Sequence, residues 1–118
     1  STLMRSSAAS DVYKRQIFSR ERVSAIFTGN DQMAFGVYRW AFEKRLSIPE
    51  ELSVVGFDDV PQAATVIPPL TTFRFPVREV AEHAVRLLLA KQQKTFRPEE
   101  SRTLHMQMTV RNSVTVKS

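Results

Sequence analysis

The chain has 118 residues, a formal net charge of +5 and no cysteine. Its length fits one small domain at most, and the absence of cysteine excludes a disulfide framework or a thiolate metal site. The two histidines, His83 and His105, are too far apart in sequence to support a histidine metal site. No apolar run is long enough to cross a bilayer. We therefore expect no metal, no cofactor and no membrane partner.

The charged side chains are scattered along the sequence, without a basic cluster. This pattern favours a solvated surface over a nucleic-acid-binding patch. Part of the charge lies in a doubtful segment, because residues 6–16 (SSAASDVYKRQ) read like the translation of a transposase adapter used to prepare sequencing libraries. A natural Ser/Ala-rich linker is the alternative. We expect residues 1–16 to be non-native, and residues 17–118 to be a fragment that lacks its native N-terminal part.

The remaining sequence begins with a strand, a helix and a second strand. Residues 24–30 (SAIFTGN) form a short apolar run that ends in a turn. Residues 31–45 follow as a helix, with Asn30 or Asp31 as its N-cap. Residues 52–59 (LSVVGFDD) lack polar alternation before the paired acids, which predicts a strand covered on both faces.

The second half of the sequence repeats this alternation. Residues 70–75 form a shorter extended piece, and residues 76–94 form a helix with Pro76 at its first position. Residues 102–111 alternate apolar and polar side chains, which predicts a strand with one solvent-facing side. Strands that alternate with helices predict an α/β fold with a largely parallel sheet.

Both predicted helices carry apolar stripes that need partners. The first helix has an apolar surface about twice as wide as the usual core-facing stripe of about 100°, which leaves an intramolecular core and a subunit interface both open. Its core-facing stripe comprises Met33, Ala34, Val37, Trp40 and Ala41, and Phe35, Tyr38 and Phe42 extend it. The second helix has one stripe, which needs a sheet to lie on. That stripe comprises Val77, Val80, Ala81, Ala84, Val85 and Leu88.

Four segments occur in order across residues 17–114: AIFTGNDQMAFGVYRW, SVVGFDDVP, PPLTTFRFP and TVRNS. They resemble the C-terminal part of the effector-binding domain of LacI/GalR-family transcription regulators. The resemblance implies a partial periplasmic-binding-protein-like domain, mainly the C-terminal lobe with its parallel sheet. It also implies that the helix at 76–94 crosses over into the missing N-terminal lobe.

The resemblance implies a ligand site at Asn30, Asp58 and Phe75. Ligands of open α/β sheets bind beyond the carboxyl ends of the parallel strands, and Asp58 lies at such an end. A carboxylate accepts hydrogen bonds from sugar hydroxyls, and an amide both donates and accepts. From the residues alone, a loop-capping role for Asp58 is favoured over ligand binding, and the resemblance reverses that preference. Phe75 stands where many members have a polar residue, so it would stack on a sugar face or fill the cleft wall.

The resemblance also implies a homodimer and a partner. Members dimerise through the first helix and the segment after the paired acids. The expected interface residues here are Phe35, Tyr38, Phe42, Thr65 and Val66. The parent would be a cytoplasmic repressor-type regulator that senses a small molecule, with a sugar as the expected class, and contacts operator DNA only through its missing N-terminal headpiece.

Two other classes of protein are alternatives to the regulator. A periplasmic sugar-binding protein of the same fold is the main alternative, and a signal peptide in place of a helix-turn-helix upstream would identify it. An enzyme is disfavoured, because no nucleophile elbow, phosphate loop or zinc motif occurs. Paired acids can serve as general acid and base, but neighbouring residues on a strand point to opposite faces. We therefore expect no catalysis. Arg45 stands where members usually have glycine, just past the first helix.

Overall fold

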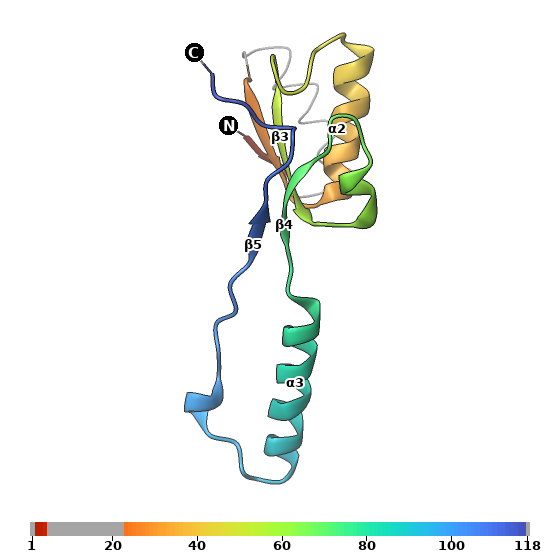
Figure 1. Cartoon of the computed structure of the whole chain (residues 1–118). Helices are drawn as coiled ribbons and strands as arrows, with labels where there is room; N and C mark the ends of the chain where they lie inside the picture. Colours follow the sequence, from red (N-terminus) through yellow and green to blue (C-terminus); the bar gives the residue numbers. More distant parts are fainter. Residues whose placement is uncertain (1, 5–22, 118) are drawn as a thin grey trace. The chain divides into compact units, whose positions relative to one another are not determined.

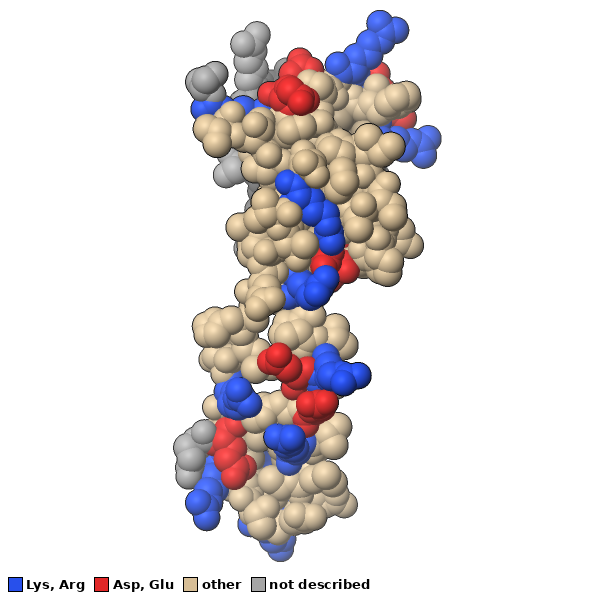
Figure 2. Space-filling model, viewed as in Figure 1, with Lys and Arg blue, Asp and Glu red and all other residues tan. Residues whose placement is uncertain are grey.

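The computed structural model describes residues 2–4 and 23–117. The chain forms two compact units, of which the first contains residues 1–74 and 108–118 and the second contains residues 75–107. The adapter-like segment at residues 6–16 lies outside the described residues, so its non-native origin stays a prediction. Figure 2 shows acidic and basic side chains interspersed over the visible face of each unit, as the scattered sequence charges indicate.

The first unit is built on a five-stranded sheet with the strands in sequence order (Figure 1). The strands are β1 (Thr2–Met4), β2 (Ala25–Thr28), β3 (Ser53–Asp58), β4 (Thr71–Arg74) and β5 (Gln107–Thr109). β1 to β4 pair in parallel, which confirms the predicted parallel sheet. β1 was not predicted, because its residues lie in the segment that the sequence indicates to be non-native.

Helix α2 (Asp31–Glu43) packs along one face of this sheet (Figure 1). Its buried apolar residues recur at helical spacing, as predicted, and they meet buried side chains from the strands and from the short 3₁₀ helix η1 (Pro61–Ala64). The core comprises Ile26, Met33, Ala34, Val37, Ala41, Leu52, Val54, Ala63 and Leu70. Trp40 is only partly buried and packs against this core. At the far end of the stripe, Phe42 is 84% exposed.

Both ends of α2 carry recognisable caps. The Asn30 side chain accepts a hydrogen bond from the Met33 N–H, so Asn30 rather than Asp31 is the N-cap. At the other end, Arg45 has φ 59°, its N–H donates to the Phe42 carbonyl, and the Leu46 N–H donates to the Ala41 carbonyl. This pattern is the Schellman motif, in which a left-handed residue ends the helix.

The second unit contains helix α3 (Val77–Gln92) and the short 3₁₀ helix η2 (Pro98–Glu100). α3 has no buried residue, and Val77 and Leu88 are 66% and 67% exposed. Of the predicted apolar stripe, Val80 is partly buried, and the other five residues are exposed in the part of the chain that the structure describes. This observation fits a helix that belongs to a missing lobe, although that assignment stays a prediction.

The last predicted strand differs from its expectation. The sequence alternation predicts a strand over 102–111, whereas β5 covers only Gln107–Thr109. Met108 and Val110, on the expected dry face, are 54% and 71% exposed. Alternation predicts a dry face only where another layer packs on it, and no described element packs on this one.

Candidate functional site

Two polar residues lie at the carboxyl edge of neighbouring strands. β2 and β3 run in parallel, and their register pairs Phe27 with Val55. Asn30 and Asp58 each lie three residues beyond that pair, just after β2 and at the last position of β3. Both residues therefore leave the sheet at the same edge, where ligands of open α/β sheets bind.

The Asn30 side chain uses its amide oxygen within the fold. Its Oδ1 accepts the Met33 N–H at 2.8 Å and so holds the N-terminus of α2. The amide NH₂ group is the remaining polar group of this partly exposed side chain. This NH₂ group is a hydrogen-bond donor, and its orientation is fixed by the helix that Asn30 caps.

Asp58 complements Asn30 as an acceptor. Its side chain is exposed, and within the described ranges no hydrogen bond contributes to the pKa of its carboxyl group. Partial desolvation and the nearby Asp31 carboxylate both raise that pKa. The backbone φ of Asp58 is 115°, a conformation that non-glycine residues adopt rarely and that is often found at functional sites.

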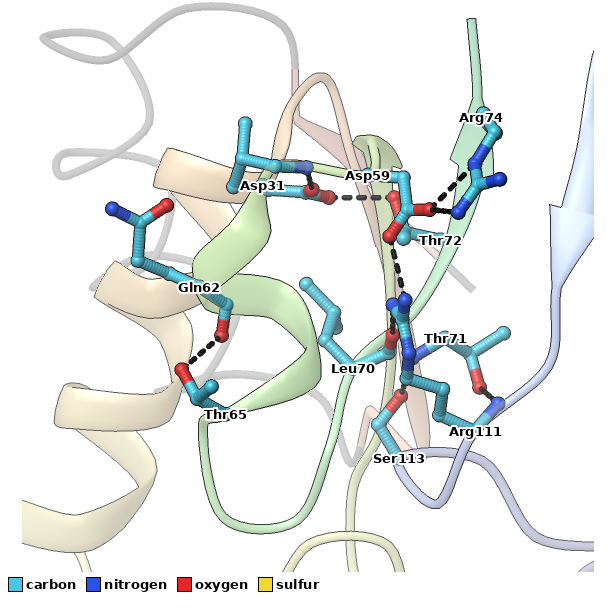
Figure 3. Close-up of polar contacts among 11 residues, drawn as sticks. Asp31, Asp59, Gln62, Thr65, Leu70, Thr71, Thr72, Arg74, Arg111 and Ser113 are labelled. Carbon is cyan, nitrogen blue, oxygen red and sulfur yellow. Dashed lines mark hydrogen bonds and ion pairs between the residues drawn. The ribbon is translucent and has the colours of Figure 1, made fainter.

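Asp59 has a structural role, in contrast to its exposed neighbour. Its side chain is 3% exposed and lies 2.8 Å from Arg111 Nη2 and 2.9 Å from Arg74 Nε and Nη2 (Figure 3). Desolvation opposes ionisation, but the hydrogen bonds from Arg111 and Arg74 outweigh it and hold the pKa of Asp59 below its ordinary value. The two adjacent acids thus face different surroundings, with Asp58 exposed and Asp59 paired with two arginines.

Asp31 is buried beneath the turn that Asp58, Asp59 and Val60 form at the end of β3. Its Oδ2 accepts the Val60 N–H at 2.8 Å, and its Oδ1 accepts the Thr72 hydroxyl at 2.6 Å (Figure 3). A Cβ atom on Gly56 would lie 2.1 Å from Asp31 Oδ1, so only glycine at that position leaves room for the carboxylate. A capping role for Asp31 was predicted from the sequence, but its contact with Thr72 on β4 was not.

The segment after β5 fastens the two central strands together. Buried Ser113 accepts the Thr71 N–H, and Arg111 donates to the carbonyl of Leu70 (Figure 3). The Ser113 hydroxyl donates to the Val54 carbonyl. Sequence reasoning missed the roles of Arg111 and Ser113. The TVRNS motif was the sequence signal for these roles, but the residues that Arg111 and Ser113 contact are distant in sequence.

Phe75, the third predicted ligand residue, is the first residue of the second unit and is 40% exposed. Its contact with a ligand stays a prediction. No group of three or more His, Cys, Asp or Glu side chains suited to a metal ion occurs among the described residues. None of the described helices is long and apolar enough to span a bilayer.

The five predicted interface residues fall into two groups. Phe35, Tyr38 and Val66 are partly buried against the core, whereas Phe42 and Thr65 are exposed. The Tyr38 hydroxyl donates to the Pro68 carbonyl at 2.8 Å, which joins α2 to the segment after η1. Desolvation raises the pKa of Tyr38 to about 12. Sequence reasoning missed Ile67, which is 91% exposed and carries an apolar surface next to Val66.

Comparison with known proteins defines the class of this fold. Residues 2–114 match the family model described as a periplasmic binding protein-like domain, and the chain belongs to that family. It is 42% identical over 76 residues to the ribose operon repressor of Escherichia coli K12, a match that covers 64% of this chain and 23% of the repressor.

Solved structures give the same result. A LacI family transcriptional regulator from Enterococcus faecalis with bound ribose superposes with a TM-score of 0.73 at 35% identity, covering 82% of this chain and 36% of that one. The lac repressor dimer bound to operator and an anti-inducer gives 0.70 at 30% identity, covering 79% and 32%. The chain thus spans well under half of each protein. The predicted α/β fold and the resemblance to LacI-family regulators are confirmed.

Proposed function

We propose that this chain is the effector-binding and dimerisation part of a LacI-family transcription regulator, and that Asn30 and Asp58 hold a sugar. The observation that carries the proposal is the position of these two residues at one edge of neighbouring parallel strands. The ribose operon repressor and the ribose-bound regulator are similar to this chain, which supports a sugar as the ligand class.

The two side chains suit a hydroxyl group. A hydroxyl both donates and accepts, so it can donate to the Asp58 carboxylate and accept from the Asn30 NH₂ group. Hydrogen bonds to an ionised carboxylate are about twice as strong as those between neutral groups. A sugar presents several hydroxyls side by side, and it can therefore engage both residues at once.

The proposed site can be tested with the chain itself. The backbone amide signals of Asn30 and Asp58 in ¹⁵N-labelled protein are followed during titration with D-ribose and then with hexoses. We expect both signals to shift in the wild type, and the Asp58→Asn variant to bind about tenfold more weakly, because a charged hydrogen bond is replaced by a neutral one. Glu43→Gln, which removes an exposed carboxylate at the far end of α2, is the matched control. Equal affinity of Asp58→Asn and the wild type would contradict the assignment.

The dimerisation surface is the second part of the proposal. Phe35, Tyr38, Phe42, Thr65 and Val66 are the proposed contact residues. The bond from Tyr38 to Pro68 ties α2 to the segment after η1, so the exposed Phe42 and Thr65 belong to elements that are joined in the fold. The lac repressor dimer, similar to this chain in structure, supports the assignment. In the parent protein, dimerised lobes would set the spacing of two DNA-binding headpieces on a palindromic operator.

Sedimentation of the chain over a range of concentrations tests this surface. Full burial of a phenylalanine side chain contributes about 1.5–3 kcal/mol, so Phe42→Ser should weaken the dimer at least tenfold. Lys44→Ser alters an exposed residue two positions further on, about 200° around the helix, and should leave the dimer intact. A dimer that Phe42→Ser does not weaken would place the interface elsewhere.

A cytoplasmic, non-enzymatic regulator remains the proposal for the parent protein, and a periplasmic sugar-binding protein remains the alternative. The ribose operon repressor and the ribose-bound LacI family protein are both transcription regulators. Their similarity to this chain supports the regulator. Recovery of the upstream reading frame separates the two, because a helix-turn-helix marks a regulator and a secretory signal peptide marks a periplasmic protein.

A further inference from the structure

The turn at the end of β3 has a backbone conformation that is unfavourable for its residues. Asp58 has φ 115° and Asp59 has φ 56°. A non-glycine residue in such a region costs about 1–3 kcal/mol, and it persists only where its surroundings hold it. The turn therefore needs anchors close to Asp58.

Two anchors are present. Directly after Asp58, the carboxylate of Asp59 is paired with Arg74 and Arg111. The second anchor is the Val60 N–H, which donates to Asp31 Oδ2 at 2.8 Å. The Asp31 side chain is 0% exposed, so its hydrogen bonds are shielded from water and are stronger for it.

Asp31 can serve as an anchor because it is itself fixed. Its second oxygen accepts the Thr72 hydroxyl of β4, and its backbone begins α2, next to the capping residue Asn30. Gly56 leaves the space that the carboxylate occupies, since a Cβ there would meet Asp31 Oδ1 at 2.1 Å. One buried side chain thus joins α2, the turn after β3 and β4.

We propose that Asp31 is the positioning residue of the ligand site, which holds the turn at Asp58 and Asp59 and so sets the direction of the Asp58 carboxylate. The same residue sits beside Asn30 in the chain, so it links the acceptor and the donor of the site to one buried group. The relevance of this to a ligand rests on the proposed function, but the positioning itself can be measured without any ligand.

Nuclear magnetic resonance of the labelled chain tests the positioning. Scalar couplings and carbon shifts report the φ angles of Asp58 and Asp59, hydrogen exchange reports the Val60 amide, and the carboxyl carbon of Asp58 reports its titration. Asp31→Ala removes both acceptors. We expect it to lose the positive φ at Asp58 and the protection of the Val60 amide. A folded Asp31→Ala chain that keeps both would overturn the proposal.

The Asp31→Asn variant tests the positioning role of Asp31 if the alanine variant does not fold. Asparagine has the same shape, can accept the Val60 N–H and can donate to the Thr72 hydroxyl, but it has no charge. We expect it to keep the positive φ and to lower the titration midpoint of Asp58, because the neighbouring negative charge is gone. The other charged groups near the turn, Asp59, Arg74 and Arg111, are unchanged.

An unchanged Asp58 midpoint in Asp31→Asn would overturn the proposal, because a group that sets the direction of Asp58 must lie close enough to act on its charge. Glu43→Gln is the matched control, since it removes another carboxylate from the same helix and should leave φ, exchange and midpoint as they are. Failure of sugar binding alongside a normal Asp31 result would refute the proposed function and leave the positioning role standing.

Discussion

Replacement of Arg45 by glycine should stabilise the first unit. Arg45 has φ 59° and is the left-handed residue of the Schellman motif that ends α2, with its own N–H and that of Leu46 bonded to the last turn. A side chain in that region costs about 1 kcal/mol relative to glycine. Arg45 is exposed, and no hydrogen bond or ion pair of its side chain is found among the described residues.

The expected gain follows from these terms. Glycine recovers the cost of about 1 kcal/mol, and its greater freedom in the unfolded chain offsets part of that gain. A net stabilisation of about 0.5–1 kcal/mol raises the melting temperature of a unit of this size by roughly 2–8 °C. Thermal unfolding followed by circular dichroism measures the shift.

The neighbouring residue is the matched control. Lys44 has φ −88°, which suits any residue, so Lys44→Gly should destabilise the unit by about 0.5–1 kcal/mol. The sign should therefore reverse between two adjacent exposed positions. If Arg45→Gly also lowers the melting temperature, the helix end is not under the strain that its φ angle indicates.

Three further predictions concern the site and the second unit. Gly56→Ala should destabilise the first unit by at least about 1–3 kcal/mol in urea unfolding, because its Cβ would press on Asp31 Oδ1 and Leu70; wild-type stability in this variant would contradict the close approach. Asp59 has a pKa held below its ordinary 3.8, so its stabilisation is present above that value and is lost as the pH falls through the folded-state pKa. Unfolding of Asp59→Asn should accordingly depend less on pH below 4, and identical profiles for variant and wild type would exclude the ion pairs as the cause. Hydrogen exchange should be fast along α3, which has no buried residue, and slow at Val37 in α2; equal protection of the two helices would mean that another surface covers α3.

Local patterns predicted β2, α2, β3 and β4, because each of these elements satisfies its own sequence signal. α2 buries the positions that its spacing indicates, and Asn30 caps it with the side chain that the sequence offers. The predicted extent and dry face of β5 were wrong, because alternating residues bury one face only when another layer packs on it. None of the described elements packs on β5.

The site was predictable only in part. The edge position of Asn30 and Asp58 follows from strand order, which the resemblance supplied. The bonds of Asp31 with Val60 and Thr72 were beyond reach, because they join residues 29 and 41 positions apart and depend on packing. The positive φ angles of Asp58 and Asp59 could not be predicted either, since such angles are usually indicated by glycine and neither residue is glycine.

The second unit is inserted into the first, because the chain leaves after Arg74 and returns at Met108. The returning segment then places Ser113 against Val54 and Thr71. A single proteolytic cut between the two crossings would therefore leave two pieces held together by the sheet. Removal of the last eleven residues, by contrast, would remove the buried Ser113 and its hydrogen bonds to β3 and β4 at the centre of the sheet. This loss would occur although the chain is shortened only at its end.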